Sequence, residues 1–394
     1  MKERSSLLRE NMLWTSALIV LLVMMIFGLA MLGTVSSAKP KELPVALVVL
    51  DQEAARPGGG SVHIGKMLQE KLQSASQLPI RWTELPSEEA AVEGLDRQKY
   101  YAALVIGKDV SSGVISLTTP SAKPGTVKIY VNEGLHAQAA GAVKQILNQV
   151  MSGAGQEIGK QLLAQLGQAM PQVPASVAGA LMTPFVIHEQ TIHPIGVNHA
   201  GGNAPNLLTQ LLWVGSMVSS ILLFAAVQRS GVAWTWRSAA TVLIAGLVIV
   251  TAADSLLMWM AEGWYGMELT NRAGLWSFML LTGVAFFLMQ FALLSWIGLP
   301  AMGLIVLTMF FAMPVIGMAP EFLPEAARVW LYSWVPLRFS SAGIRDLLYF
   351  GGSEPLEGAV TVLGWLGTGG LLLIGMLPLR KRKAAQSAAS AGRI

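Results

Sequence analysis

One stretch comes close to a known phosphate-binding signature. Residues 60–67 read GSVHIGKM and nearly match G-x-x-x-x-G-K-[ST], in which backbone N–H groups and a lysine hold phosphates. Met67 stands where a hydroxyl would ligate Mg²⁺, and the topology argued below places this loop on the face of the membrane that has no ATP. We therefore favour a glycine-rich turn that leads into a helix over a nucleotide site.

A second stretch groups potential metal ligands. His188, Glu189, His193 and His199 lie within twelve residues of one another. Their spacing fits no zinc motif, and the surrounding prolines leave no helix that would align them on one face. We interpret the stretch as a solvated connector and expect no metal site.

Two polar side chains interrupt long apolar runs. Asp254 lies within residues 239–260, and Gln290 lies within residues 273–296. A carboxylate in such a run costs a few kcal/mol unless it is paired or hydrated, so Asp254 should face a bundle interior or an aqueous cavity. It also lies near the outer end of its run, from which it could reach the interface. We take both residues as candidates for a substrate path or for locking helices together.

The composition is that of an integral membrane protein. Of 394 residues, 53% are hydrophobic and 13% charged, and the mean hydropathy is +0.53. The net charge of +4 comes from residues beside the apolar runs, so we expect no nucleic-acid partner. Without cysteine the chain has no disulfide or thiolate metal site. The apolar block carries no catalytic constellation, so we expect no enzymatic activity and no cofactor.

The apolar runs predict six membrane-spanning helices. About 20 helical residues cross a hydrocarbon core of about 30 Å. The runs are residues 12–33, 207–227, 239–260, 273–296, 300–318 and 358–378. The first run also resembles a signal peptide with a small-residue cleavage site at residues 36–38, but its 22 residues favour an uncleaved anchor.

The expected fold class is an α-helical multi-pass membrane protein with an α/β extracytoplasmic domain inserted between helices 1 and 2. Residues 1–11 form a cytoplasmic N-terminus, residues 34–206 the inserted domain, residues 207–378 a five-helix membrane domain and residues 379–394 a basic cytoplasmic tail. The segments assigned to the inside hold ten Lys and Arg, and the two short outside loops hold four. This asymmetry predicts a cell-membrane protein with both termini in the cytoplasm.

The insert reads as alternating strands and helices. Strands are expected at residues 45–50, 80–83, 101–106 and 127–131, and helices at residues 62–75 and 88–98. Apolar residues at helical spacing predict a long amphipathic helix over residues 143–166, with Gly153 and Gly155 as possible interruptions. Because prolines recur in residues 171–205, we expect an extended connector there. Residues 319–357 should form short interfacial helices.

Several of these stretches resemble the amino-terminal module of the YhgE/Pip (phage infection protein) family. They are residues 43–51, 63–66, 88–95 and 100–106, together with the return to the membrane at residues 204–206 and 212–215. Residues 336–352 are similar to the carboxyl-terminal segment of ABC-2 type transporter permeases. Val49 and Asn206 depart from the family pattern, and the insert is compact for the family.

The resemblance implies a permease subunit with six spans that works as a homodimer or heterodimer in the lipid bilayer. A separate ABC ATPase would engage its cytoplasmic face, which in this chain includes Arg229, Trp234, Trp236 and Arg237. The substrate would be hydrophobic or amphipathic and exported. An alternative stays open, in which the protein is a cell-envelope scaffold or receptor, such as a phage receptor or secretion accessory protein, without transport of its own.

Overall fold

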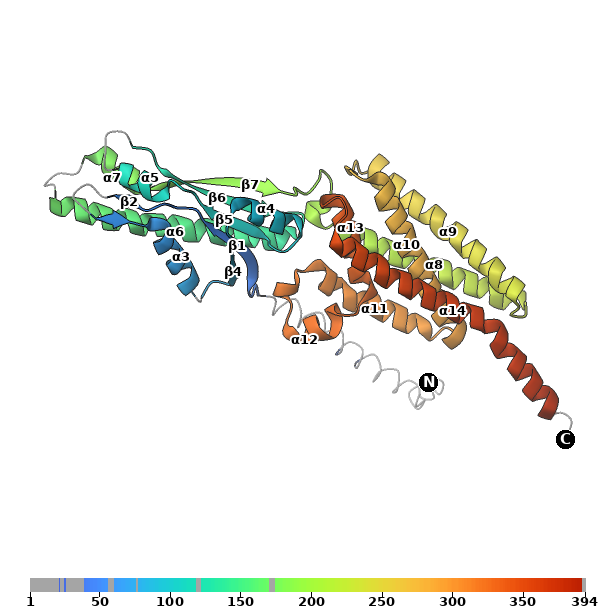
Figure 1. The fold of residues 1–394 in the computed structure, drawn as a ribbon. Helices are drawn as coiled ribbons and strands as arrows, with labels where there is room; N and C mark the ends of the chain where they lie inside the picture. Colours follow the sequence, from blue (N-terminus) through green and yellow to red (C-terminus); the bar gives the residue numbers. More distant parts are fainter. Residues whose placement is uncertain are drawn as a thin grey trace, which may run out of the picture. The chain divides into compact units, whose positions relative to one another are not determined.

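The computed structural model describes residues 39–55, 60–75, 77–117, 122–169 and 174–391, together with Leu21 and Met25. The expected N-terminus at residues 1–11 and first span at residues 12–33 lie outside these described residues, apart from Leu21 and Met25. The described chain forms two units (Figure 1). An α/β unit contains residues 40–202 and 349–354, and a helical unit contains residues 203–348 and those from 355 onward.

A five-stranded mixed sheet is the centre of the α/β unit, with strand order β4-β1-β5-β6-β7. Its strands are β1 (Leu43–Val49), β4 (Ile80–Glu84), β5 (Ala102–Ile106), β6 (Gly125–Asn132) and β7 (Phe185–Ile192). β1 pairs in parallel with β4 and β5, β6 runs antiparallel to β5, and β7 runs parallel to β6. β1 and β5 are buried on both faces, which explains their continuous apolar sequences. A short antiparallel ribbon joins β2 (Ala54–Ala55) and β3 (Ser61–Val62).

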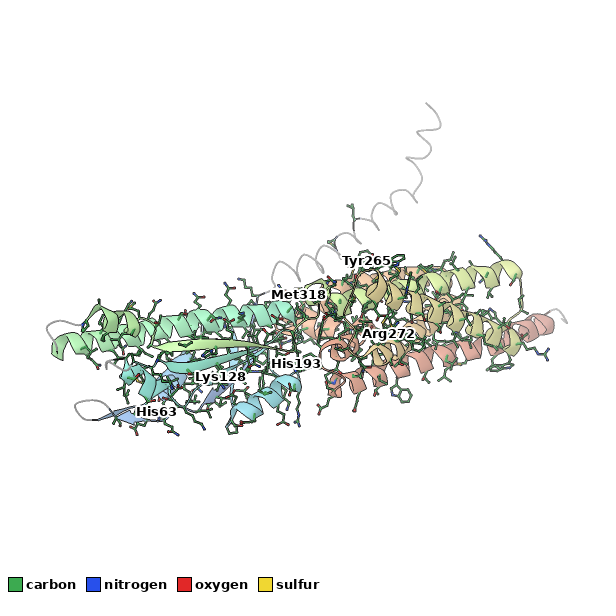
Figure 2. The ribbon with its side chains drawn as sticks, turned by 90° about the horizontal axis from the view of Figure 1, so that it is seen from above. His63, Lys128, His193, Tyr265, Arg272 and Met318 are labelled. Carbon is green, nitrogen blue, oxygen red and sulfur yellow. The ribbon has the colours of Figure 1, made fainter. Side chains whose placement is uncertain are left out.

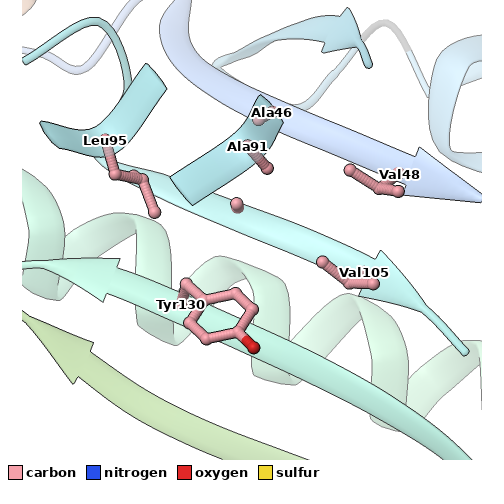
Figure 3. Close-up of a cluster of buried hydrophobic side chains, with 7 residues drawn as sticks. Ala46, Val48, Ala91, Leu95, Val105 and Tyr130 are labelled. Carbon is pink, nitrogen blue, oxygen red and sulfur yellow. The ribbon is translucent and has the colours of Figure 1, made fainter. Parts of the chain in front are cut away.

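The helices of this unit are α3 (Ile64–Ser74), α4 (Glu88–Asp96), α5 (Val110–Ser116), α6 (Ala137–Ala169) and α7 (Ala175–Leu181). Ser87 caps α4 by accepting a hydrogen bond from the Ala90 N–H at 3.2 Å. Between α4 and the sheet lies a core that includes Ala46, Val48, Leu95 and Tyr130 (Figure 3).

α6 runs without a break through Gly153 and Gly155, which we had considered as interruptions. Gly159, farther along this helix, allows another segment to pack closely against it. A methyl group at Gly159 would lie 1.9 Å from the Leu181 carbonyl oxygen, so this glycine is needed where the end of α7 approaches. The tertiary contact, and not helix propensity, explains the glycine.

The expected extended connector over residues 171–205 was wrong in part. It contains α7, the strand β7 and a 3₁₀ turn at Ala200–Gly202. All eight residues of β7 pair with β6, from Phe185 beside Gly125 to Ile192 beside Asn132. β7 is an edge strand with mostly exposed side chains, so it lacks the apolar pattern that identifies a strand in the sequence. Pro184 and Pro194 lie just outside it, where proline does not remove a ladder hydrogen bond.

The helical unit contains four helices that are long and apolar enough to cross a membrane. They are α8 (Ala204–Ser230), α9 (Trp236–Gly263), α10 (Arg272–Ile297) and residues Glu354–Leu379 of α14 (Glu354–Ala391). Two thirds of the apolar window of α10 is buried, so α10 is the central helix of the four. α11 (Ala301–Gly317) is apolar but has only 17 residues and contains Pro314. The structure thus supports four of the six expected spans, together with this shorter helix.

The segment between α11 and α14 forms the short helices that its sequence predicts. A 3₁₀ turn (Pro320–Phe322), the short α12 (Glu325–Ala327), a π-helical turn (Arg328–Tyr332) and α13 (Pro336–Tyr349) follow one another. In α13 the buried side chains include Leu337, Ile344 and Leu347, which recur at helical spacing.

Candidate functional site

α9 and α10 pack closely because each presents a glycine to a large or polar side chain of the other. A methyl group at Gly246 of α9 would lie 2.0 Å from the Phe287 ring of α10. A methyl group at Gly283 of α10 would lie 2.4 Å from Asp254 Oδ2 of α9. Glycine at such positions lets helix backbones approach closely inside a membrane. The Asp254 carboxylate is therefore held in a notch that only glycine leaves open.

Asp254 is deeply buried in this interface. Its residue exposure is 5%, and Oδ2 has no hydrogen-bond partner among the described residues. α9 continues to Gly263, so Asp254 lies nine residues before the helix end, which is about 13 Å at 1.5 Å per residue. α9 has 28 residues, about 42 Å in length, so it is longer than a hydrocarbon core of about 30 Å. Asp254 is thus buried in the half of α9 that leads to α10.

α8 joins the same interface through hydroxyl groups. Ser216 donates a hydrogen bond to the Gly283 carbonyl oxygen at 2.9 Å, and Ser220 donates to that of Phe287 at 3.4 Å. Gln290, with no exposed surface, donates from Nε2 to the Trp213 carbonyl oxygen at 3.4 Å. The structure thus places both candidate path residues, Asp254 and Gln290, in the core formed by α8, α9 and α10.

Several polar atoms in this core lack a partner. Among the described residues, the buried atoms without a hydrogen bond include Trp213 Nε1, Asp254 Oδ2, Thr282 Oγ1 and Gln290 Oε1. A buried unsatisfied polar atom costs about 1–3 kcal/mol, and each needs a physical explanation. We call Trp213, Ser216, Asp254, Thr282, Gly283 and Gln290 the polar seam. Its unpaired donors and acceptors are able to hydrogen-bond to water, to a polar group of a ligand, or to a neighbouring helix that has shifted its position.

The four candidate ATPase-contact residues lie at one tight turn between α8 and α9. Gly231 ends α8 with a φ of 60°, and Thr235 starts α9 through reciprocal hydrogen bonds with Ser238. Trp234 packs against Phe291 with ring centroids 6.4 Å apart. The other three are exposed, namely Arg229, Trp236 and Arg237. Trp234 therefore supports the turn, and the exposed three are free to meet a partner.

An open groove lies where α9 ends and α10 begins. Its volume is about 410 Å³, and it is lined by Ser255, Met258, Trp259, Arg272, Ala273 and Trp276. Trp276 Nε1 donates a hydrogen bond to Ser255 Oγ at 3.1 Å, and Arg272 pairs with Glu262 at 3.0 Å. Met258 lies one helical turn from Asp254 on the same face of α9. The groove is thus next to the buried carboxylate along α9.

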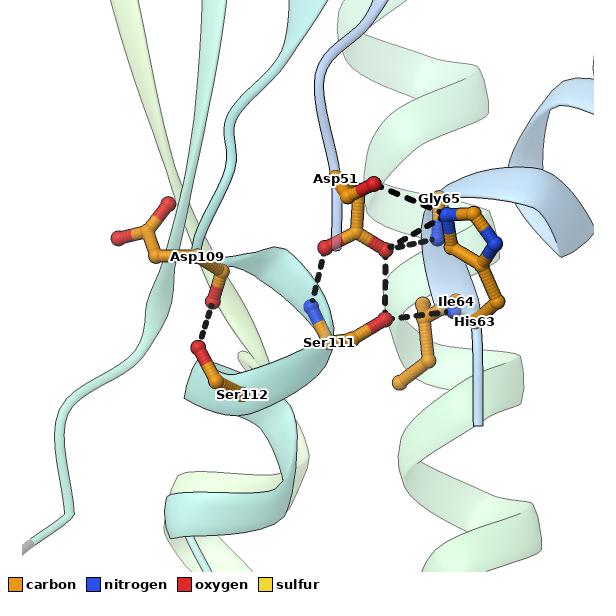
Figure 4. A network of polar contacts seen from close by, with 7 residues as sticks. All are labelled: Asp51, His63, Ile64, Gly65, Asp109, Ser111 and Ser112. Atoms are coloured by element: carbon orange, nitrogen blue, oxygen red, sulfur yellow. Dashed lines mark hydrogen bonds and ion pairs between the residues drawn. The ribbon is translucent and has the colours of Figure 1, made fainter. Parts of the chain in front are cut away.

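In the α/β unit, the carboxylate of Asp51 lies against the stretch that resembles a phosphate-binding loop (Figure 4). Asp51 accepts hydrogen bonds from the Gly65 N–H, the Ser111 N–H and the Ser111 hydroxyl at 2.7, 2.7 and 2.5 Å. The Ser111 oxygen in turn accepts from the Ile64 N–H at 2.7 Å. A protein carboxylate therefore satisfies the helix N-terminus where a phosphate would bind. This geometry supports the interpretation as a glycine-rich turn.

Asp51, His63 and Ser111 superficially resemble a nucleophilic triad. Ser111 has no exposed surface and its hydroxyl donates directly to the carboxylate, while His63 Nε2 contacts the Asp51 carbonyl oxygen at 3.0 Å. The serine therefore has no histidine base and no access to a substrate. Sequence reasoning missed this network because Ser111 follows Asp51 by 60 residues, and only the parallel pairing of β1 with β5 brings them together.

Three of the four potential metal ligands make contacts with different partners. Glu189 on β7 pairs with Lys144. His193, which is labelled in Figure 2, lies 2.9 Å from Asp96 Oδ1 and 3.0 Å from the Tyr349 carbonyl oxygen. His199 Nδ1 lies 3.2 Å from the Tyr349 hydroxyl. Within the part of the chain that the structure describes, no three potential ligands gather at one point. The two histidines instead hold residues 349–354 in the α/β unit.

Glu88, Lys128 and Tyr130 form a charged cluster on the sheet. Lys128 donates to Glu88 at 2.8 Å, and the Tyr130 hydroxyl also donates to it. Burial raises the pKa of Glu88, but the hydrogen bonds from Lys128 and Tyr130 outweigh that effect and lower its pKa below the ordinary value. Burial and the hydrogen bond to Glu88 raise the pKa of Tyr130. These interactions join α4 to β6 and so stabilise the α/β unit.

Comparison with known proteins places the chain in a family without a described activity. No curated protein matches the chain. One solved structure, described as a domain of a "putative ABC type-2 transporter" from Thermotoga maritima MSB8, shares 15% identity with a TM-score of 0.25 and covers 38% of this chain and 84% of that domain. A likeness at that TM-score carries no weight for fold or function. The family model "Protein of unknown function (DUF3533)" matches residues 12–369, so the chain belongs to the DUF3533 family.

Proposed function

We propose that this protein is a membrane permease subunit of the ABC-2 type that exports a hydrophobic or amphipathic substrate. It acts as a homodimer or heterodimer in the cell membrane with both termini in the cytoplasm, and a separate ATPase supplies the energy. The polar seam carries the proposal. A bundle that only anchors a domain gains nothing from buried polar atoms without partners, since each of them costs free energy.

The position of the seam supports a path through the membrane. Asp254 lies nine residues before the end of α9, and Gln290 lies two helical turns beyond Gly283 on α10. Seven residues return to the same face of a helix, so Gln290 shares the face of α10 that Asp254 contacts at Gly283. Polar groups in an apolar span commonly mark substrate pathways.

The short turn between α8 and α9 supports the ATPase partnership. Trp236 is 58% exposed, and Arg229 and Arg237 are exposed beside it. Exposed Trp and Arg are enriched in the residues that dominate protein interfaces. The positive charge also agrees with a cytoplasmic location for this turn.

A photocrosslinking amino acid at Trp236 tests the proposal in native cells. We expect crosslinking to a subunit that hydrolyses ATP. The matched control is Trp330, which is 76% exposed and belongs to a segment expected outside the cell. A crosslink to the ATPase from Trp330 alone, or from neither position, would contradict the proposal.

Efflux of a lipophilic dye from cells gives the second test. We expect Asp254→Ala and the double change Arg229→Gln/Arg237→Gln each to reduce efflux at least tenfold. The scaffold or receptor alternative predicts that these variants keep full function, whereas deletion of residues 40–202 abolishes it. The two sets of variants therefore separate the two functions.

A further inference from the structure

The surroundings of Asp254 Oδ2 disfavour a negative charge on the carboxylate. Oδ2 is buried against Gly283 and has no donor among the described residues. The notch is closed tightly enough that even a methyl group at Gly283 would clash with the carboxylate at 2.4 Å. Neither water nor a cation therefore fits between that oxygen and the α10 backbone.

The packed helices bring no compensating charge. In α8, α9 and α10 the other charged residues are Arg229, Arg237, Glu262 and Arg272. Arg229 and Arg237 lie at the far helix ends, and Glu262 lies eight residues from Asp254, about 12 Å along α9. Glu262 is itself paired with Arg272. Asp254 Oδ2 lies against Gly283, Val250 lies beside the same glycine, and Ser216 donates a hydrogen bond to the Gly283 carbonyl oxygen.

An ionised carboxylate without a partner is strongly disfavoured in such a site, whereas a neutral carboxylic acid is tolerated. We propose that Asp254 is a proton-binding site that controls the packing of α9 against α10. The protonated acid fits the Gly283 notch and keeps the two helices together. When the proton is lost, the carboxylate carries a charge that only water can stabilise. The helices α9 and α10 then separate at Gly283 because water must reach the carboxylate.

The neighbouring groove provides the route for that proton. It is open on one side and includes Met258, one turn from Asp254. Separation of α9 and α10 would extend the groove along α9 to the carboxylate. The biological use of this site, as a control of the substrate path, rests on the proposed function. The test of the proton-binding site measures helix separation instead of transport, so this proposal and the proposed function can fail independently.

The absence of cysteine allows direct measurement of the separation. Spin labels at Ala252→Cys on α9 and Ser277→Cys on α10, both exposed, report the interhelical distance in the purified full chain in lipid nanodiscs. We expect the mean distance to lengthen by about 2 Å or more between pH 5 and pH 9, as in other helix shifts. With Asp254→Asn, a neutral residue of the same shape, the distance should stay short throughout.

Two further variants control the result. Glu262→Gln should keep the pH response, which assigns the response to Asp254 and not to the exposed ion pair. Gly283→Ala should give the longer distance at every pH because its methyl group fills the notch. A distance in the wild-type chain that does not change with pH would overturn the proposal, as would an Asp254→Asn variant that responds like the wild type.

Discussion

Two buried carboxylates in this protein have opposite surroundings. Asp51 accepts three hydrogen bonds from Gly65 and Ser111, so its charge is satisfied inside the α/β unit. Asp254 has an oxygen without a donor and lies against a glycine. Hydrogen bonds offset the cost of burying a polar group, and a buried polar atom without them is costly. The first residue therefore supports structure, whereas the second is suited to change its state.

Removal of the Asp51 carboxylate should strongly destabilise the α/β unit. Asp51→Ala leaves the Gly65 and Ser111 N–H groups buried without acceptors, which should lower the free energy of unfolding by about 3 kcal/mol. Thermal unfolding of the full chain, followed by far-ultraviolet circular dichroism, measures the loss. Glu53→Gln, at an exposed neighbouring position, should change stability by less than about 0.5 kcal/mol. Equal effects of the two substitutions would refute this account of Asp51.

The Glu88 cluster predicts a pH dependence of stability. Because its folded-state pKa is lowered, ionised Glu88 stabilises the fold above its ordinary value of 4.5. This contribution is lost as the pH falls below 4.5 and through the lowered pKa. Denaturant unfolding at a series of pH values should show a smaller loss of stability in this range for Glu88→Gln than for the wild type. Glu93→Gln, at an exposed helix position, should leave the wild-type profile unchanged.

At the scale of elements, paired glycine notches define how α9 and α10 meet. Gly246 receives the Phe287 ring, and Gly283 receives the Asp254 carboxylate. Small residues matter in a membrane bundle because lipid tails are as apolar as the side chains, and close van der Waals packing must supply the association energy. The two notches lie on one face of each helix, at spacings of eight residues on α9 and four on α10.

Filling the Gly246 notch should weaken this helix pair. Gly246→Ala places a methyl group against Phe287, which should cost about 1–3 kcal/mol of stability. Thermal unfolding in detergent, followed by tryptophan fluorescence, measures the change. Adding Phe287→Leu should recover part of the loss because the smaller side chain leaves room for the methyl group. Gly303→Ala in α11, where nothing lies within 4 Å, is the control and should not destabilise the protein.

At the scale of the whole molecule, the placement of the α/β unit outside the cell stays a prediction from charge asymmetry. Single cysteines at Ser61 and Ser387 test it without background, since the chain has no cysteine. An impermeant maleimide should label Ser61→Cys on intact cells and should label Ser387→Cys only after lysis. The reverse pattern would invert the orientation and move the turn with Arg229 and Arg237 to the outside.

Hydropathy and strand composition were enough to locate the longest helices and the buried strands. Length and hydropathy located α8, α9, α10 and α14 because a bilayer imposes a minimum apolar length that leaves a local signal. The buried strands β1 and β5 were equally clear, since both faces of each strand are covered and their sequences are uniformly apolar. Asp254 and Gln290 stood out for the same local reason, as polar residues in apolar runs.

Contacts between residues far apart in the chain could be known only from the folded structure. The edge strand β7 left no apolar pattern, and its pairing with β6 depends on a partner 60 residues away. The Asp51–Ser111 network and the Asp254–Gly283 notch each join separate elements, so neither has a spacing that a sequence window can detect. Burial and hydrogen-bond satisfaction are properties of a packed neighbourhood, and packing alone gave the Asp51 carboxylate its three donors and left Asp254 Oδ2 without one.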